Sequence, residues 1–317
     1  MGNAKNAGKT TVLNSIVSHS QKPLIITSIG LDGEAIDQVT FLEKPQIDVR
    51  INDIVVSAKD TLKAFEASYE IIEETQMFTA IGPIVICKIT KPGKVLVAGP
   101  SLVDDMQVLV DRLMDQYDHR ILIDGAFFRQ SFAKVSDASI FVVGANDSVD
   151  MEQTIDHAFY AYKKLVLSKI KKEYHVFNHV ENIAVLEHNH IKVLNYDSIL
   201  GNVDRLFNEI NDNTKAVYFP KTLTDEFVSK WTSTYHKLNF DIVVKSGVHI
   251  QLNQTNLKNI FKMDHDIFVI NPIEVCGVCI NPYSPRGYTY DPIEFKKVLS
   301  KKLKRDVINV KEDDASE

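Results

Sequence analysis

Apolar residues follow two hydrophobic patterns that alternate along the chain. Short continuous apolar runs, typical of buried strands, occur at residues 24–29, 84–89, 95–98, 121–124 and 140–143. Apolar positions with a helical period occur between them at residues 10–18, 59–68, 104–116 and 150–169. Continuous apolar strands that alternate with helices indicate a parallel sheet covered on both faces. We therefore predict an α/β fold with a mostly parallel sheet and helices on both sides.

The second half of the chain repeats this alternation. It predicts strands at residues 216–219, 240–244, 267–270, 275–280 and 306–310, and helices at 198–210, 224–235 and 292–302. A lysine-rich stretch, 163–172, closes the long helix before it, and we interpret this stretch as a solvated helix face. We place a soft boundary there, which gives a nucleotide-binding domain at 1–171 and a smaller C-terminal α/β region at 172–317. The alternative is that the two regions pack as one unit.

The strongest chemical signal lies at the N-terminus. Residues 3–11 read Asn-Ala-Lys-Asn-Ala-Gly-Lys-Thr-Thr, which contains the core of a P-loop, with Asn3 where the pattern usually has its first glycine. Backbone N–H groups of such a loop surround phosphate oxygens, and the start of the following helix favours negative charge. Lys9 would reach the terminal phosphates and the Thr10 hydroxyl would ligate Mg²⁺. The predicted nucleotide-binding residues are Asn6, Ala7, Gly8, Lys9, Thr10 and Thr11.

This loop within an α/β pattern predicts a P-loop NTPase-like fold that binds ATP and Mg²⁺. The signature normally follows a buried strand, but only Met1 and Gly2 precede the loop, so we expect a shortened N-terminus without that strand. The alternative is an Asn- and Gly-rich turn that caps an ordinary helix.

Three further residues are candidates for catalysis. Asp124 ends the apolar run 121–123 in a Walker B pattern and is expected near Mg²⁺; the alternative is that it caps the turn through Gly125. Asp32 follows the first strand and would bind Mg²⁺ or position water, or else lie in a solvated turn. Arg129 would stabilise charge on a transferring phosphate, or pair with a surface carboxylate. Thr10, Asp124 and Asp32 are thus the predicted Mg²⁺ ligands.

The composition of the chain limits the classes of binding partner and the cellular compartment that we expect. The 317-residue chain carries a net charge of −6, which argues against broad binding to nucleic acid. Apolar runs stay well short of the ~20 residues that span a bilayer, and no signal peptide is visible. Three cysteines fit a reducing cytoplasm. Two prolines stiffen the aromatic loop 281–288, which we interpret as a rigid connector or as a recognition loop for a partner or a second ligand.

Four segments together resemble a known family. Residues 2–11, 27–34, 124–126 and 281–287, in this order, resemble P-loop accessory proteins associated with adenosylcobalamin-dependent lysine 5,6-aminomutase and ornithine 4,5-aminomutase, over nearly the whole chain. The resemblance implies the small subunit of a reactivating factor, partnered by a larger MutS-like ATPase. Such a factor would use ATP to open the aminomutase and release damaged cofactor.

The resemblance also assigns roles to residues and leaves alternatives open. It implies that Lys9 and Thr10 bind ATP–Mg²⁺ and that Asp124 and Asp32 hold the metal or position water. Homo-oligomerisation stays open. The competing hypotheses are a P-loop small-molecule kinase or ATP-dependent ligase, and a binding module with a degenerate loop.

Overall fold

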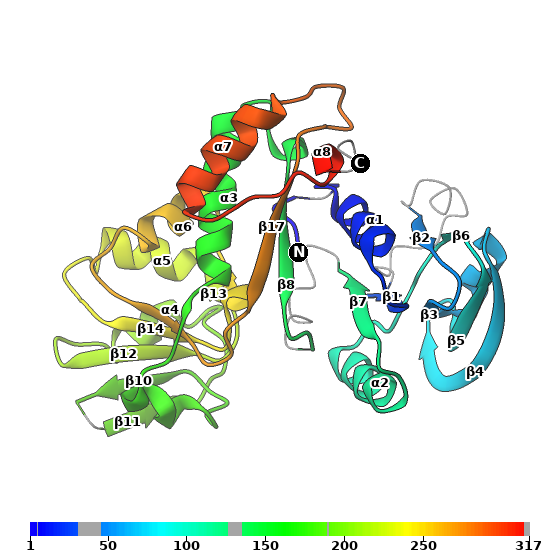
Figure 1. Ribbon diagram of the computed structural model, residues 1–317. Helices are drawn as coiled ribbons and strands as arrows, with labels where there is room; N and C mark the ends of the chain where they lie inside the picture. The colour runs from blue at the N-terminus through cyan, green and yellow to red at the C-terminus, as the bar shows by residue number, and fades with distance from the viewer. Residues whose placement is uncertain (5, 31–45, 126–134, 189, 314–317) are drawn as a thin grey trace. The chain divides into compact units, whose positions relative to one another are not determined.

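The computed structural model describes residues 1–4, 6–30, 46–125, 135–188 and 190–313 (Figure 1). The chain has a mixed α/β fold and divides into two compact units. The first comprises Met1–Thr154 and Gly277–Glu317, and the second comprises Ile155–Cys276. The predicted boundary after residue 171 lies inside the second unit. In the described ranges no helix combines the length and the apolar character that crossing a bilayer requires.

The first unit contains a five-stranded sheet with the order β4-β5-β3-β1-β7. Strand β1 is parallel to both β3 and β7, whereas β5 is antiparallel to β3 and to β4. The sheet is therefore mixed and not mostly parallel, because the long β4–β5 hairpin (cyan in Figure 1) adds two antiparallel pairings, β3–β5 and β4–β5. The elements of this part are α1 (Lys9–His19), β1 (Leu24–Ser28), β2 (Ile47–Val49), β3 (Ile54–Ala58), η2 (Lys59–Ala64), β4 (Ser68–Thr79), β5 (Gly82–Lys91), β6 (Gly93–Val95), α2 (Val103–Gln116) and β7 (Arg120–Asp124).

Helices cover both faces of this sheet, as the alternation of side chains along a strand requires. Leu13 of α1 packs in one buried cluster with Leu24 and Ile26 of β1. Ile25, which points to the opposite face, belongs to a second cluster with Leu109 of α2. The predicted two-sided covering is confirmed for these strands.

The remaining elements of the first unit lie around β8. They are β8 (Ser139–Gly144), η4 (Ala145–Asp147), α7 (Pro292–Leu303) and α8 (Val310–Asp313); α3 (Met151–Leu165) and β17 (Val275–Asn281) cross the boundaries between the units. Strand β17 pairs with β8. Gly2 forms a parallel bridge with Val142 of β8, so the residues before the loop do take part in sheet hydrogen bonding.

Several predicted elements differ from the structure. Of the predicted strand at 95–98, only Val95 lies in a strand, β6. Residues 59–68 form a short 3₁₀ helix, η2, after which β4 begins at Ser68. The predicted helix at 198–210 is α-helical only over Val203–Phe207. The predicted strand at 306–310 is reduced to one bridge between Ile308 and Cys279, and a helical turn, α8, starts at Val310. In each case a short apolar run fits more than one element, and tertiary pairing decides between them.

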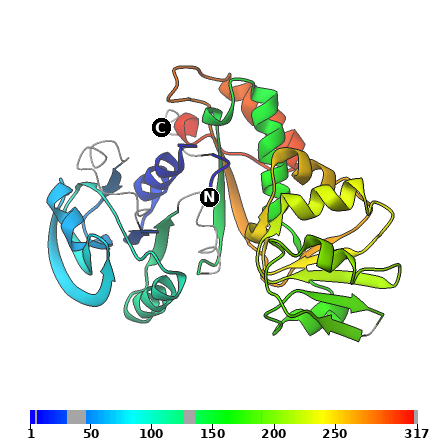
Figure 2. The same cartoon turned by 180° about the vertical axis from the view of Figure 1, so that it is seen from behind.

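The second unit contains a six-stranded sheet with the order β11-β10-β12-β14-β16-β9, seen from behind in Figure 2. Strands β12, β14, β16 and β9 are parallel, and β10 and β11 are antiparallel additions. Its elements are β9 (Ser168–Lys169), η5 (Lys172–Phe177), β10 (Ala184–Glu187), β11 (His190–Val193), α4 (Val203–Phe207), β12 (Thr214–Phe219), β13 (Leu223–Thr224), α5 (Asp225–Ser233), β14 (Asp241–Val244), η6 (Gly247–His249), β15 (Ile250–Gln251), α6 (Gln254–Ile260) and β16 (Ile267–Val269). Trp231, the single tryptophan of the chain, is fully buried in the main core of this unit.

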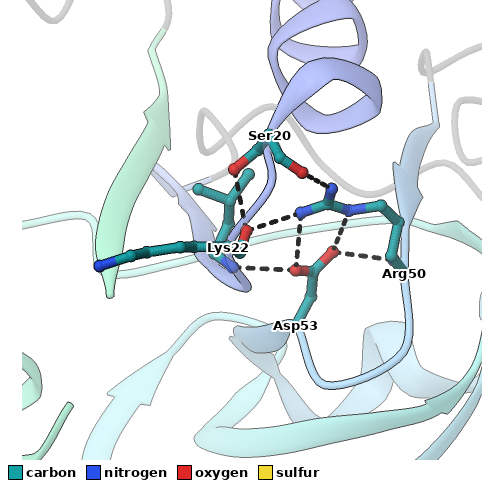
Figure 3. Close-up of polar contacts among 5 residues, drawn as sticks. Ser20, Lys22, Arg50 and Asp53 are labelled. Atoms are coloured by element: carbon teal, nitrogen blue, oxygen red, sulfur yellow. Dashed lines mark hydrogen bonds and ion pairs between the residues drawn. The ribbon is translucent and has the colours of Figure 1, made fainter. Parts of the chain in front are cut away.

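A buried carboxylate joins the segment after α1 to the start of β3 (Figure 3). Asp53 is fully buried and accepts hydrogen bonds from the backbone N–H of Leu24 at 2.9 Å and of Arg50 at 2.8 Å. The Arg50 guanidinium lies 3.4 Å from the same carboxylate and donates to the carbonyl oxygens of Ser20 and Lys22. Several donors thus satisfy the buried charge of Asp53. Because these donors come from both segments, the bonds also fix where β1 begins relative to β3.

Candidate functional site

Helix α1 starts directly from the N-terminal loop, residues 3–8. Gly8 is its N-cap residue and has a φ of 98°, a left-handed conformation that glycine adopts without steric cost. Asn6, at φ 59°, is also left-handed, as asparagine tolerates better than most residues. No side chain caps the helix and its first turn contains no acidic residue. The first amides of α1 therefore keep the positive partial charge that attracts an anion.

Asn3 explains how the loop tolerates a residue other than glycine at its start. Its side-chain Oδ1 accepts the backbone N–H of Gly144 at 2.9 Å, and its own N–H donates to the Val142 carbonyl at 3.0 Å. The loop then passes so close to the end of β8 that a Cβ on Gly144 would lie 2.5 Å from the Ala7 Cα. Asn3 and Gly144 together hold the N-terminal loop on the carboxyl end of β8.

Lys9 places its ammonium group in this loop. Its Nζ lies 3.5 Å from the Ala4 carbonyl oxygen, at the long limit of a hydrogen bond. Burial lowers the pKa of Lys9 below its usual value, and the carboxylate of Asp124 opposes that shift. Both effects show that Lys9 is a partly desolvated cation with a carboxylate within electrostatic range, so an anionic ligand would stabilise its charged form.

The position of Asp124 follows from the pairing of two strands. It ends β7 and lies opposite Ser28, the last residue of β1, in a parallel register. The backbone N–H of Ile29 also donates to the Asp124 carbonyl oxygen at 2.9 Å. The carboxyl ends of β1 and β7 thus bring Asp124 to the same edge of the sheet as Lys9, as the Walker B interpretation expects.

The predicted residues divide into two groups. Asn6, Ala7, Gly8, Lys9, Thr10 and Thr11 lie in or directly after the N-terminal loop, and Asp124 is electrostatically coupled to it through Lys9. Asp32 and Arg129 lie outside the described residues, so their roles stay predictions. Thr10 and Thr11 are half-buried at the start of α1, where a hydroxyl next to the first amides is suited to a metal ligand.

Asn281 joins the site, although the sequence analysis assigned a role only to the whole loop 281–288 and not to this residue. It ends β17, and a Cβ on Gly8 would lie 2.8 Å from both the Cβ and the Nδ2 of Asn281, so the side chain lies against the loop. Its Oδ1 accepts the N–H of Tyr283 at 3.3 Å. The available signal was its place directly after an apolar strand, the same signal that identified Asp124.

The segment after Asn281 folds back as a tight hairpin, residues 282–290. Tyr290 N–H donates to the Pro282 carbonyl and Ser284 N–H to the Tyr288 carbonyl, both at 3.0 Å. The hydroxyl of Tyr288 lies 2.7 Å from the carbonyl oxygens of both Ala145 and Ser148, which share its one proton as acceptors, and the Tyr290 hydroxyl also donates to Ser148. The hairpin is therefore fastened to the turn that follows β8.

The site thus combines an uncapped helix start, a partly buried lysine and a nearby carboxylate, which suits a phosphorylated ligand with a divalent cation. Comparison with protein families, with curated proteins and with solved structures found no match for this chain.

Proposed function

We propose that the chain binds ATP with Mg²⁺ through the loop and helix start formed by Asn6–Thr11, and that its first unit is a P-loop NTPase-like domain. The observation that carries the proposal is the electrostatic coupling of a partly buried Lys9 to Asp124 beside a helix start without a side-chain cap. A buried lysine that lacks a phosphate pays a desolvation cost, which a triphosphate would offset.

Each group has a defined task in this proposal. The amides of Gly8 to Thr11 bind phosphate oxygens, and Lys9 binds the terminal phosphates. Thr10 and Asp124 hold the Mg²⁺ ion, which neutralises phosphate charge when it is bound. The Asn3 Oδ1 accepts the Gly144 N–H and so keeps the loop on β8.

We propose that the chain uses this nucleotide site to reactivate a cobalamin-dependent aminomutase, together with a MutS-like ATPase partner. Support comes from the resemblance of four sequence segments, two of which contain Lys9 and Asp124. ATP would act by its different affinity for two conformations of the complex, since a ligand shifts an equilibrium only by that difference. Release of damaged cofactor from the mutase would follow from the shift.

Substitution of Lys9 by Ala tests both parts of the proposal. Calorimetry should detect Mg²⁺–ATP binding to the unchanged chain, and Lys9→Ala should weaken it about 100-fold or more, since a desolvated charge-to-phosphate contact is lost. Lys63→Ala is the matched control, because Lys63 is an exposed lysine of the same unit that pairs with Asp60. In a recovery assay with inactivated mutase, partner and ATP, Lys9→Ala should fail where Lys63→Ala succeeds.

Two results would contradict the proposal. If the unchanged chain gives no heat with Mg²⁺–ATP, the nucleotide site is wrong. If it binds ATP but mutase recovers equally fast without it, the reactivation role is wrong. ATP turnover with a small metabolite and no protein partner would instead favour the kinase or ligase hypothesis.

A further inference from the structure

The two ends of a bound triphosphate would face different strands. Helix α1, which begins at Lys9, lies against β7, whose last residue is Asp124, so the terminal phosphates and the metal belong on that side of the loop. Gly144 and Asn281, at the ends of β8 and β17, contact the loop at Ala7 and Gly8. A nucleotide whose terminal phosphates lie toward β7 therefore extends its other half toward the ends of β8 and β17.

The surface at that second side is polar and held in place. The hairpin 282–290 and the turn 145–148 are fastened together by the hydroxyls of Tyr288 and Tyr290. The Tyr290 hydroxyl also bonds Thr154 Oγ1 at 2.9 Å. Such cross-links reduce the ordering that a ligand has to impose on binding.

Asn281 presents one hydrogen-bonding group that this scaffold does not use. Its Oδ1 is occupied by the Tyr283 N–H, whereas its Nδ2 donates to none of the residues that the structure describes. The Nδ2 lies against the Gly8 Cα side of the loop. Because the hydrogen bond to the Asn281 Oδ1 fixes the plane of the side-chain amide, it also fixes the direction of the N–H₂ group. A donor with a fixed direction is suited to recognising an acceptor on a ligand.

We propose that Asn281 and the hairpin 282–290 bind the nucleoside half of the triphosphate, with the Asn281 Nδ2 donating to an acceptor on the base or the ribose. This inference rests on the proposed nucleotide site and adds the part of the ligand that the N-terminal loop does not bind. It makes Asn281 a specificity residue, because inorganic triphosphate offers nothing to that amide.

The test compares Mg²⁺–ATP with Mg²⁺–tripolyphosphate by calorimetry. Asn281→Ala should weaken ATP binding about 5-fold, the effect of one lost hydrogen bond, and change tripolyphosphate binding by less than about 2-fold. Asn271→Ala is the matched control, because Asn271 is also an asparagine that precedes a proline, but it follows β16 in the second unit. It should alter neither affinity.

A second variant guards against a change in the loop itself. Asn281→Asp keeps the acceptor for Tyr283 and replaces the donor, and its added charge repels both ligands alike. The loss for ATP should exceed the loss for tripolyphosphate. Equal losses for both ligands in both variants, or no loss for either, would overturn the inference while leaving the nucleotide site intact. Failure of the unchanged chain to bind either ligand would instead remove the proposed site and the inference with it.

Discussion

Asn3 fastens the start of the N-terminal loop to β8 with a side-chain bond that glycine cannot form. The residue that departs from the usual P-loop pattern thus has a structural task in this chain. Asn6 is a second example, since asparagine is one of the few residues other than glycine that adopt a left-handed backbone conformation. At the residue scale, departures from a motif are informative when the substituted side chain has a partner of its own.

The buried Asp53 gives a prediction at this scale. Asp53→Asn should lower the free energy of unfolding by about 2 kcal/mol, because an amide donor would face the N–H groups of Leu24 and Arg50 and the charge opposite Arg50 would be lost (Figure 3). Asp60→Asn is the control, since the Asp60 side chain is exposed at the surface. Urea denaturation followed by circular dichroism measures both, and equal stability of the two variants would contradict the assigned role.

Helices α1 and α2 serve different ends at the element scale. The flank of α1 with Leu13 packs on β1, and another flank with Val12 packs on Val142 of β8 and Cys279 of β17. This double contact places the start of α1 between two groups of strands. Helix α2 packs on the sheet through buried residues on a single face.

A pair of neighbouring residues on α2 tests that division. Leu109 is fully buried and Val108 is 56% exposed. Leu109→Ala should destabilise the protein by about 3 kcal/mol, the usual effect of a cavity in a core, whereas Val108→Ala should change stability by less than about 1 kcal/mol. The midpoint of urea denaturation reports both values. A similar shift for the two variants would show that α2 does not cover the sheet as described.

Sequence patterns predicted the elements that carry strong periodicity. The strand before Asp124 and the helix after Gly8 are confirmed, because a continuous apolar run predicts the first and a helical period of apolar residues predicts the second. Strand β4 was not predicted, since its residues are largely exposed and show no apolar alternation. The contact of Asn281 with Gly8 could not be predicted either, because it joins residues far apart in the sequence. The local spacing of apolar residues predicts strongly periodic helices and strands well, but it carries no information on long-range pairing.

The whole molecule is organised as one unit inserted into another. Residues 155–276 form the second unit, and the chain returns to the first at Gly277. Sequence patterns do not indicate this return, because apolar strands and helices alternate in the same way on both sides of it. A boundary drawn from the lysine-rich stretch therefore falls inside the second unit.

A buried lysine predicts how the second unit responds to pH. Burial lowers the pKa of Lys164 to about 8, and its Nζ donates to the Ile250 carbonyl at 3.2 Å. Between about pH 8 and the unfolded value of 10.5, the unfolded state holds a proton that the folded state has lost, so stability rises with pH in this window. The contribution is roughly 1 kcal/mol per pH unit.

Fluorescence of Trp231, buried in the same unit, follows this transition directly. As pH rises from 8 to 10, the unfolding free energy of the unchanged chain should increase relative to that of Lys164→Met. The reason is that methionine fills the space without titrating. Lys172→Met, at an exposed lysine of η5, is the control for replacing a lysine of this unit by methionine. A constant difference for Lys164→Met would contradict the depressed pKa.

The order of synthesis adds a consequence to the pairing of the N-terminal loop. Asn3 bonds to Gly144, and Gly8 lies against Asn281, so this segment meets both partners only after the ribosome has synthesised residue 281. The proposed nucleotide site would therefore form late in translation. A product that stops before Asn281 would lack the complete site even though it contains every residue from Asn6 to Thr11.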